Sequence, residues 1–331
     1  MPHTFSRREA LRISGLAAAA ALFPSSLARA ARAVGDARGG ERKRVLRIAH
    51  LTDIHVQPEL RADKGMAAAL KHVRELTDKP DVIFTGGDHV MDTFAQKEPR
   101  ARALWDLWSR TLKDECAIPV ESCIGNHDVW GVAKSKSQAT GAEPLYAKAW
   151  AMDALKLTRP YRSFDRAGWH FIFLDSVFPE GEGYVGKIDD QQFEWLAGDL
   201  ASVKPGTPTM IVSHIPIFSV AVLDFGKVDE KKPTQVDPSL MHSDASRLHG
   251  LFLKHPTLKV CISGHLHLLD RVDFDRVTYL CDGAVCGNWW KGRHKQCDEG
   301  YALINLYDDG TFEREYVTYG WKAEPPPAKK T

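Results

Sequence analysis

The sequence has no apolar run of the ~20 residues that a membrane-spanning helix needs, no visible internal repeat, and almost no excess of one charge. Its 331 residues carry 44 basic and 43 acidic side chains. Four arginines and one glutamate fall in the first thirty residues, which leaves 40 basic and 42 acidic residues, a net charge of −2, in the rest. This balance gives no electrostatic reason to expect a nucleic acid as a partner. The short apolar runs predict no stable membrane anchor.

Cysteine is absent from the first 115 residues, so no thiol near the N-terminus is available for a lipoprotein anchor. Six cysteines follow, and an oxidising compartment would permit disulfides among them. Cys123 and Cys261 lie inside apolar runs and are predicted to be buried thiols. Cys286 and Cys297 bracket "GNWWKGRHKQ" and are the pair that we expect to form a disulfide.

Residues 1–33 contain the three parts of an export signal in order. "SRREALR" places Arg7 and Arg8 before a weakly apolar stretch, Ile13 to Phe23, and "ARA" at 28–30 offers a small-residue cleavage site. The pattern resembles a twin-arginine signal. It implies the twin-arginine export machinery as a partner and a periplasmic or secreted location. The alternative is a disordered tail with a chance arginine pair.

The remaining chain divides into three parts by composition. Residues 34–43, "VGDARGGERK", predict a solvated linker, and residues 322–331, "KAEPPPAKKT", predict a disordered tail. Residues 44–321 between them hold the apolar runs of a folded domain.

Within this domain, short apolar runs alternate with amphipathic segments. The predicted strands are 45–51, 81–86, 119–125, 170–175, 209–214 and 259–264, and the predicted helices are 63–77, 98–114, 143–156, 189–203 and 243–254. Such alternation predicts an α/β fold with a largely parallel core. Hairpin patterns near Gly168, in 271–285 and around Asp308 to Gly310 add antiparallel strands. Two mixed sheets packed face to face, with helices outside, fit this pattern better than a single Rossmann sheet.

Residue types that bind metals follow five of the predicted strands. They are Asp53, His55, Asp88, Asn126, His127, Asp128, His214, His265 and His267. Ligands collect at the carboxyl ends of strands in open α/β sheets. Residues i and i+2 of a strand point the same way, so we expect Asp53 with His55, and His265 with His267, to converge.

Each fragment alone is common by chance, but five of them at strand ends predict a metal site. Carboxylates and imidazoles would be costly to bury unpaired. Mixed oxygen and nitrogen ligands without thiolate favour Zn, Mn, Fe or Co over a structural thiolate zinc site.

The order D-x-H, G-D, G-N-H-D, H, G-H-x-H resembles that of the calcineurin-like metallophosphoesterases and spans about residues 45–270. The resemblance implies a four-layer αββα sandwich with a dinuclear metal centre. By position, one metal would be held by Asp53, His55 and His267, and the other by Asn126, His214 and His265. Asp88 would bridge both metals. His127 would face the substrate and assist the leaving oxygen, with Asp128 as its orienting partner.

The resemblance also implies a reaction, the hydrolysis of phosphoric esters. Two metals about 3.5–4 Å apart can activate a bridging water and clamp a phosphoryl group. The leaving alkoxide needs a proton, which a histidine can supply near neutral pH. A carboxylate on the other ring nitrogen would fix the orientation of that histidine.

Differences between this sequence and other branches of the family narrow the expected class of substrate. Met91 stands where purple acid phosphatases have a tyrosine, and "GDHVMDTF" lacks the arginine of the Ser/Thr phosphatases. The chain resembles the bacterial cyclic-nucleotide and glycerophosphodiester phosphodiesterases, so we expect small phosphodiesters as substrates. The alternatives are a phosphomonoesterase or nucleotidase on the same site, and a non-catalytic scaffold. A nuclease is disfavoured by the charge.

The segment "CGNWWKGRHKQC" predicts a substrate rim. Its candidate residues are Asn288, Trp289, Trp290 and Lys291, which combine aromatic surface, an amide and a cation. The alternative is a pair of core tryptophans. His89 either faces the pocket or packs, and the segment 219–242 is either a lid or a passive loop.

Overall fold

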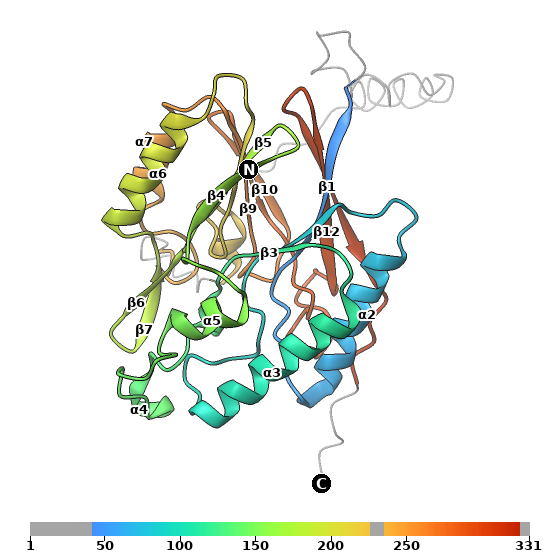
Figure 1. Ribbon diagram of the computed structural model, residues 1–331, viewed down its shortest axis with the longest axis vertical. Helices are drawn as coiled ribbons and strands as arrows, with labels where there is room; N and C mark the ends of the chain where they lie inside the picture. Colours follow the sequence, from blue (N-terminus) through green and yellow to red (C-terminus); the bar gives the residue numbers. More distant parts are fainter. Residues whose placement is uncertain (1–41, 226–234, 325–331) are drawn as a thin grey trace, which may run out of the picture. The chain divides into compact units, whose positions relative to one another are not determined.

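Two mixed β-sheets form the centre of the computed structural model (Figure 1). The structure describes residues 42–225 and 235–324. The predicted signal peptide, most of the predicted linker, part of the segment 219–242 and the end of the predicted tail lie outside these ranges. Within them, no helix combines the length and the apolar character of a membrane span.

The first sheet has the strand order β13–β12–β1–β2–β3. Its strands are β1 (Arg44–Leu51), β2 (Val82–Thr85), β3 (Val120–Ser122), β12 (Gly300–Tyr307) and β13 (Phe312–Thr318). Strands β1, β2 and β3 pair in parallel, whereas β12 pairs antiparallel to both β1 and β13. The predicted parallel strands and the hairpin turning at Asp308 to Gly310 are confirmed.

The second sheet has the order β10–β11–β9–β8–β5–β4. Its strands are β4 (Arg162–Arg166), β5 (Trp169–Phe173), β8 (Thr209–Val212), β9 (Leu258–Ser263), β10 (Asp270–Phe274) and β11 (Val277–Cys281). The four inner strands β5, β8, β9 and β11 run parallel, and the two edge strands are the antiparallel arms of hairpins. Both of these hairpins were expected from the sequence.

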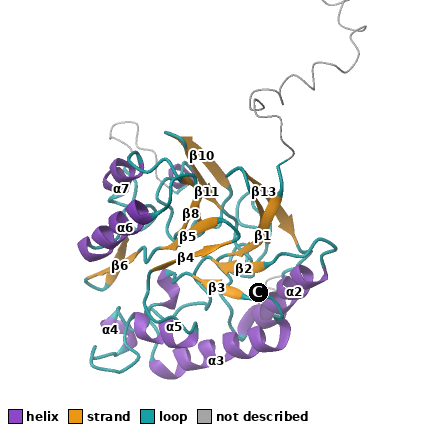
Figure 2. Cartoon of the chain, turned by 45° about the horizontal axis from the view of Figure 1, so that its top comes forward, coloured by secondary structure: helices purple, strands orange, loops and turns teal. Residues whose placement is uncertain are grey.

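Side-chain alternation along the strands produces four layers. In β1, Ile48 faces the core between the sheets and Ala49 faces the opposite core, because successive strand residues point to opposite faces. The helices α2 (Ala62–Glu75) and α3 (Glu98–Glu115) cover the outer face of the first sheet. The helices α6 (Asp190–Ser202) and α7 (Ala245–Phe252) cover that of the second, so helices flank the strands in Figure 2. The predicted αββα sandwich is therefore confirmed.

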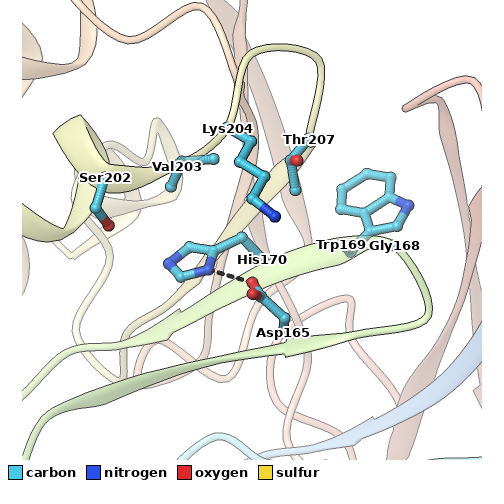
Figure 3. Close-up of a pocket in the computed structure, with 8 residues that line it drawn as sticks. All are labelled: Asp165, Gly168, Trp169, His170, Ser202, Val203, Lys204 and Thr207. Atoms are coloured by element: carbon cyan, nitrogen blue, oxygen red, sulfur yellow. Dashed lines mark hydrogen bonds and ion pairs between the residues drawn. The ribbon is translucent and has the colours of Figure 1, made fainter.

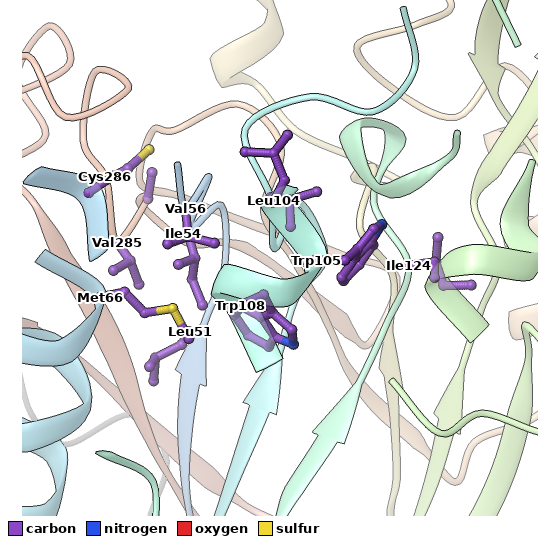
Figure 4. Close-up of a cluster of buried hydrophobic side chains, with 14 of the residues drawn as sticks. Leu51, Ile54, Val56, Met66, Leu104, Trp105, Trp108, Ile124, Val285 and Cys286 are labelled. Atoms are coloured by element: carbon purple, nitrogen blue, oxygen red, sulfur yellow. The ribbon is translucent and has the colours of Figure 1, made fainter. Parts of the chain in front are cut away.

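Helix α3 anchors the outer core beside the first sheet. Trp105 and Trp108 are both buried, one helical turn apart, and face Leu51, Ile54 and neighbouring core residues (Figure 4). A buried aromatic side chain removes roughly 150–250 Å² from water, and at about 25 cal/mol per Å² the pair contributes several kcal/mol. This core fixes the loops that leave the carboxyl ends of β1 and β2.

Several short elements complete the fold. They are η2 (Glu59–Arg61), η3 (Asn126–Asp128), α4 (Lys134–Ser137), α5 (Lys148–Ala154), η4 (Ala221–Asp224) and the hairpin of β6 (Val177–Glu180) and β7 (Gly183–Gly186). The sequence does not predict this hairpin, because Pro179, Gly181 and Gly183 interrupt any alternating pattern. The helix predicted from residue 143 begins five residues later, at Lys148.

Candidate metal centre

The candidate ligands lie on loops that leave the carboxyl ends of β1, β2, β3, β8 and β9. The first three strands belong to one sheet and the last two to the other. Parallel strands of one sheet end at the same edge, which is where open α/β sheets collect ligands. The centre is therefore assembled by both sheets at once.

Left-handed backbone, rather than strand alternation, turns the side chains inward. Strand β1 ends at Leu51 and β9 at Ser263, before the residues that were expected to alternate. Asp53, His55, Asp88, His265 and His267 all have positive φ, between 47° and 72°. Such conformations cost roughly 1–3 kcal/mol each and persist where the surrounding structure fixes them, commonly at functional sites. The i, i+2 argument was thus wrong in its geometry, although the side chains do converge.

Two glycines permit the close approach of these loops. A Cβ on Gly125 would lie 2.2 Å from both the backbone N and Oδ1 of Asp88. A Cβ on Gly264 would lie 1.9 Å from Oγ1 of Thr52 and 2.3 Å from Oδ2 of Asp53. Gly125 has φ −100°, so it is needed for space and not for a left-handed turn.

One group of donors surrounds Oδ1 of Asp53. That oxygen lies 3.4 Å from Nε2 of His267 and 3.9 Å from Nε2 of His55. The two imidazole nitrogens are 3.1 Å apart. Oδ1 of Asp53 is buried and has no hydrogen-bond partner in the part of the chain that the structure describes. Its other oxygen accepts hydrogen bonds from Oγ1 of Thr52 and the N–H of His265.

A second group surrounds Nε2 of His214. This nitrogen lies 3.0 Å from Oδ1 of Asn126 and 3.3 Å from Oδ2 of Asp88, and the ring of His265 is centred 5.0 Å away. The same oxygen of Asp88 lies 3.6 Å from Nε2 of His55 in the first group. Asp88 is therefore the residue that both groups share.

Main-chain carbonyls hold the second nitrogen of three of these histidines. Nδ1 of His214 lies 2.7 Å from the carbonyl oxygen of Gly86, and Nδ1 of His267 lies 2.6 Å from that of Gly287. Nε2 of His265 lies 2.9 Å from the carbonyl oxygen of Ser239. A carbonyl can only accept, so each of these nitrogens carries a proton, and the opposite nitrogen is the one that faces the other candidate ligands. That is the arrangement of metal-binding histidines.

Burial and mutual charge shift the titration of these groups. Burial opposes ionisation of Asp88, but His214 and His127 outweigh it and hold the pKa of that carboxyl well below its usual range. Burial lowers the pKa of His55 to about 3. Burial also opposes protonation of His214, but Asp88 raises its pKa to about 9.

The residues present fit a pair of metal cations. Buried carboxylates, an unpaired carboxylate oxygen and closely spaced imidazole nitrogens are costly in a protein interior without a cation. The donors are oxygen and nitrogen, as Zn, Mn, Fe and Co accept. Cys286 lies 3.9 Å from Nδ1 of His267, but that nitrogen already bonds Gly287, so the thiol is not needed as a ligand.

His127 lies beside the shared carboxylate without belonging to either group. Its Nε2 is 4.0 Å from Oδ2 of Asp88 and its side chain is 28% exposed. Its Nδ1 is 3.6 Å from Oδ1 of Asp92. Burial opposes its protonation, but Asp88 and Asp92 together raise the pKa of His127. The partner that faces this histidine is Asp92, so the expectation of Asp128 in that role is wrong.

Asp128 instead fastens two loops of the centre together. Its carboxylate accepts hydrogen bonds from the backbone N–H groups of Gly125, Asp88 and His89, at 2.9, 3.0 and 2.8 Å. Nδ1 of His89 lies 2.8 Å from the same carboxylate, and its ring packs 4.6 Å from that of Trp108. His89 is fully buried and does not face the site, which corrects its assignment as a substrate residue.

The residues of the predicted substrate rim lie in different environments. Trp290 is buried, donates from Nε1 to the carbonyl oxygen of His55, and packs on Trp321, so it is a core residue and not a rim residue. Trp289 is half-buried, with its ring 4.5 Å from that of His267. Asn288 is half-buried and Lys291 is exposed.

The expected disulfide is also absent. Cys286 and Cys297 are free thiols in different hydrophobic clusters, the first beside Val285 (Figure 4) and the second beside Tyr316. Cys123 and Cys261 are buried free thiols, as expected.

A pocket of about 250 Å³ lies away from the candidate ligands, at the opposite end of β5 (Figure 3). His170 lines it, held between Asp165 on Nδ1 at 2.6 Å and Asp199 on Nε2 at 2.9 Å. Two carboxylates on the two ring nitrogens require both nitrogens to carry protons, so this histidine is a cation. It joins β4 to α6 and takes no part in the candidate centre.

The chain is similar to several known proteins. The family model described as calcineurin-like phosphoesterase matches residues 46–269. A 3′,5′-cyclic-nucleotide phosphodiesterase of Nostoc sp. is 24% identical over 294 residues, which cover 84% of this chain and 95% of that protein. A Rhodococcus erythropolis protein named "Probable cyclic nucleotide phosphodiesterase" is 26% identical, covering 79% of this chain and 80% of that protein.

Two solved structures share the fold. A dimetal phosphatase from Danio rerio has a TM-score of 0.54 at 14% identity, covering 84% of this chain and all of that one, 100%. GAP50, the anchor in the inner membrane complex of Plasmodium, has a TM-score of 0.53 at 19% identity, covering 85% of this chain and 87% of that one. At these identities the likeness concerns the fold alone.

Proposed function

The chain belongs to the calcineurin-like phosphoesterase family and is a metal-dependent phosphoric ester hydrolase, and from this premise we propose that it hydrolyses small phosphodiesters. The observation that carries the proposal is the sharing of Asp88 between two groups of donors, with the half-exposed His127 beside it. The two relatives named for cyclic nucleotides favour 3′,5′-cyclic nucleotides within this class.

In the proposed site, Asp53, His55 and His267 would hold one metal, Asn126, His214 and His265 would hold the other, and Asp88 would be shared by both. When bound, the metal pair supplies a nucleophile from water and neutralises charge on the phosphoryl group. The chain's own contribution begins with position. The backbone of Asp88 is held by Asp128, and the imidazoles are held by main-chain carbonyls. Preorganised ligands of this kind need no rearrangement during reaction.

His127 supplies the proton that the leaving oxygen needs. Its side chain is 28% exposed next to the shared carboxylate, so an ester group can reach it. Asp92 faces its Nδ1, which leaves Nε2 directed toward the centre as the donor. Asp88 and Asp92 raise its pKa, which favours the protonated form that a general acid needs.

A phosphomonoesterase on the same site is the second candidate, and the exposure of His127 favours neither ester class.

Export through the twin-arginine pathway to the periplasm or outside the cell is part of the proposal. It is supported by the order of the arginine pair, apolar stretch and small-residue site in residues 1–33.

The test is a substrate panel on metal-reconstituted protein, with elemental analysis of the same samples. We expect about two metal equivalents, and faster turnover of bis-p-nitrophenyl phosphate and 3′,5′-cyclic AMP than of p-nitrophenyl phosphate. Faster monoester turnover would establish the second candidate instead. No turnover of any ester by protein with full metal content would refute the proposed substrates.

A further inference from the structure

Tyr184 lies at the edge of the candidate centre, on strand β7 of the hairpin that the sequence analysis missed. Its ring is centred 6.2 Å from that of His265, edge to face, and 5.7 Å from that of Phe94. The side chain is half-buried. It stands on the His265 side of the centre, whereas Trp289 stands beside His267.

The Tyr184 hydroxyl has no hydrogen-bond partner among the residues that the structure describes. Several other tyrosines of the described chain have one, whereas the hydroxyl of Tyr279 is buried without one and lies in the core beneath α7, away from the centre. The hydroxyl of Tyr319 donates to the carbonyl oxygen of Val285 at 2.7 Å, that of Tyr316 to Asp298 at 2.8 Å, and that of Tyr301 lies 2.8 Å from Nδ1 of His72. A partly buried phenol that finds no protein partner is free to bond a ligand.

The environment keeps this phenol protonated. Burial raises the pKa of Tyr184 well above its usual range, and the carboxylates of Asp88, Asp237 and Asp53 raise it further. Two of those carboxylates belong to the candidate centre. The group is therefore an O–H donor in the field of the centre.

The hairpin is fixed in place. The N–H of Gly186 donates to the carbonyl oxygen of Pro238 at 2.7 Å, and the N–H of Ser243 donates to the carbonyl oxygen of Gly186 at 2.7 Å. The same segment supplies Ser239, whose carbonyl oxygen bonds His265. Tyr184 and His265 are thus braced by one stretch of chain, which keeps their separation constant.

We propose that Tyr184 contacts the substrate, and that its O–H donates a hydrogen bond to a non-bridging phosphoryl oxygen of the ester on the His265 side of the centre. This inference rests on the proposed function. The negative charge of that oxygen increases in the transition state, so a fixed donor aimed at it strengthens as the reaction proceeds. The covalent chemistry is unchanged, because the tyrosine neither gives up nor gains a proton.

Tyr184→Phe tests the donor because it removes one oxygen and leaves the ring. In the full-length, metal-loaded protein we expect unchanged metal content and melting temperature. The dissociation constant for inorganic phosphate, measured by calorimetry, should rise about tenfold, as for a lost hydrogen bond to a charged group. The kcat/KM for bis-p-nitrophenyl phosphate should fall about 10- to 100-fold.

Tyr161→Phe is the matched control, since Tyr161 is also half-buried but stacks on Trp195 outside the centre. It should change neither measurement. The inference would be overturned if Tyr184→Phe kept the wild-type phosphate affinity and the wild-type kcat/KM. It would also be overturned if only a second variant, Tyr184→Ala, lost them, because the ring and not the hydroxyl would then matter. If the wild-type protein cleaves no diester but Tyr184→Phe still weakens phosphate binding, the proposed function fails and the contact stands.

Discussion

His127 is 28% exposed, its Nε2 lies 4.0 Å from Oδ2 of Asp88, and it is not among the residues proposed to hold the metals. His127→Ala should therefore leave metal content near two equivalents. Turnover should fall about 10²–10³-fold for alkyl leaving groups, the usual range for general acid catalysis. The loss should be much smaller for p-nitrophenolate, which departs without a proton. The measurement is kcat across a leaving-group series, and a uniform loss would argue against the acid role.

Asp92 and Asp128 are carboxylates with different roles. Asp92 faces the ring of His127, whereas Asp128 accepts hydrogen bonds from backbone N–H groups. Asp92→Asn should keep both metals and lower turnover about 10-fold, because an orienting partner is weakened. In Asp128→Asn, an amide N–H would face the backbone N–H groups that donate to the carboxylate in the wild-type protein. It should cost about 2–4 kcal/mol of stability and lower metal occupancy. Elemental analysis and chemical denaturation of both variants separate these outcomes, and equal metal loss would contradict the assignment.

The loops that form the centre pack closely against one another. Gly125 allows one of these close approaches, that of its own loop to Asp88. Gly125→Ala would drive a methyl group into the backbone of Asp88. We expect at least about 1–3 kcal/mol of destabilisation, the usual cost of overpacking, together with reduced metal content. Gly198→Ala is the control, because that position lies in α6 with open space around the added methyl. It should be neutral or slightly stabilising. Thermal melts and metal analysis of both variants compare them directly.

His170 joins two elements, the β4–β5 hairpin and α6, through Asp199 and Asp165. Asp199 and then Asp165 raise the pKa of His170 in the folded protein. A raised folded pKa gives stability that is complete below the unfolded pKa of about 6.5 and is lost as pH rises through the folded value.

The stability difference between wild type and His170→Gln should accordingly be largest below about pH 6.5 and shrink as the pH rises through the higher folded pKa. We expect about 1 kcal/mol or less at its maximum, because Asp165 is 80% exposed and solvent screens the pair. Urea unfolding of both proteins across this range measures the difference. A difference that does not vary with pH would contradict a charged clamp.

Across the whole molecule, the centre ties the two sheets together, so metal binding and global stability should be linked. Removing metal with a chelator should lower the melting temperature by at least about 5 °C, since ligand at a hundred times its Kd adds about 2.7 kcal/mol. Adding back Mn²⁺ or Zn²⁺ should restore it. A melting temperature that is independent of metal would contradict a centre built across both sheets.

The sequence by itself determined the strands of the two large sheets, most helices and the order of the five polar fragments, because short apolar runs and local turn residues act over a few positions. It predicted where side chains would gather, since strands of one direction end at one edge. It also matched the family model over residues 46–269. The assignment of individual ligands and of His127 stays a prediction from that pattern and from the geometry.

Only the tertiary structure decided which neighbour each side chain meets. Asp92 rather than Asp128 faces His127, although Asp128 is its neighbour in sequence. Trp290 is buried and the adjacent Trp289 is not. Trp290 bonds a backbone oxygen 235 residues away, and Asp128 bonds backbone groups 39 and 40 residues away. Burial and pairing at such separations depend on how two sheets and their loops pack, which no local pattern records. Tyr184 belongs to the same class, since only the folded hairpin brings its hydroxyl to the centre.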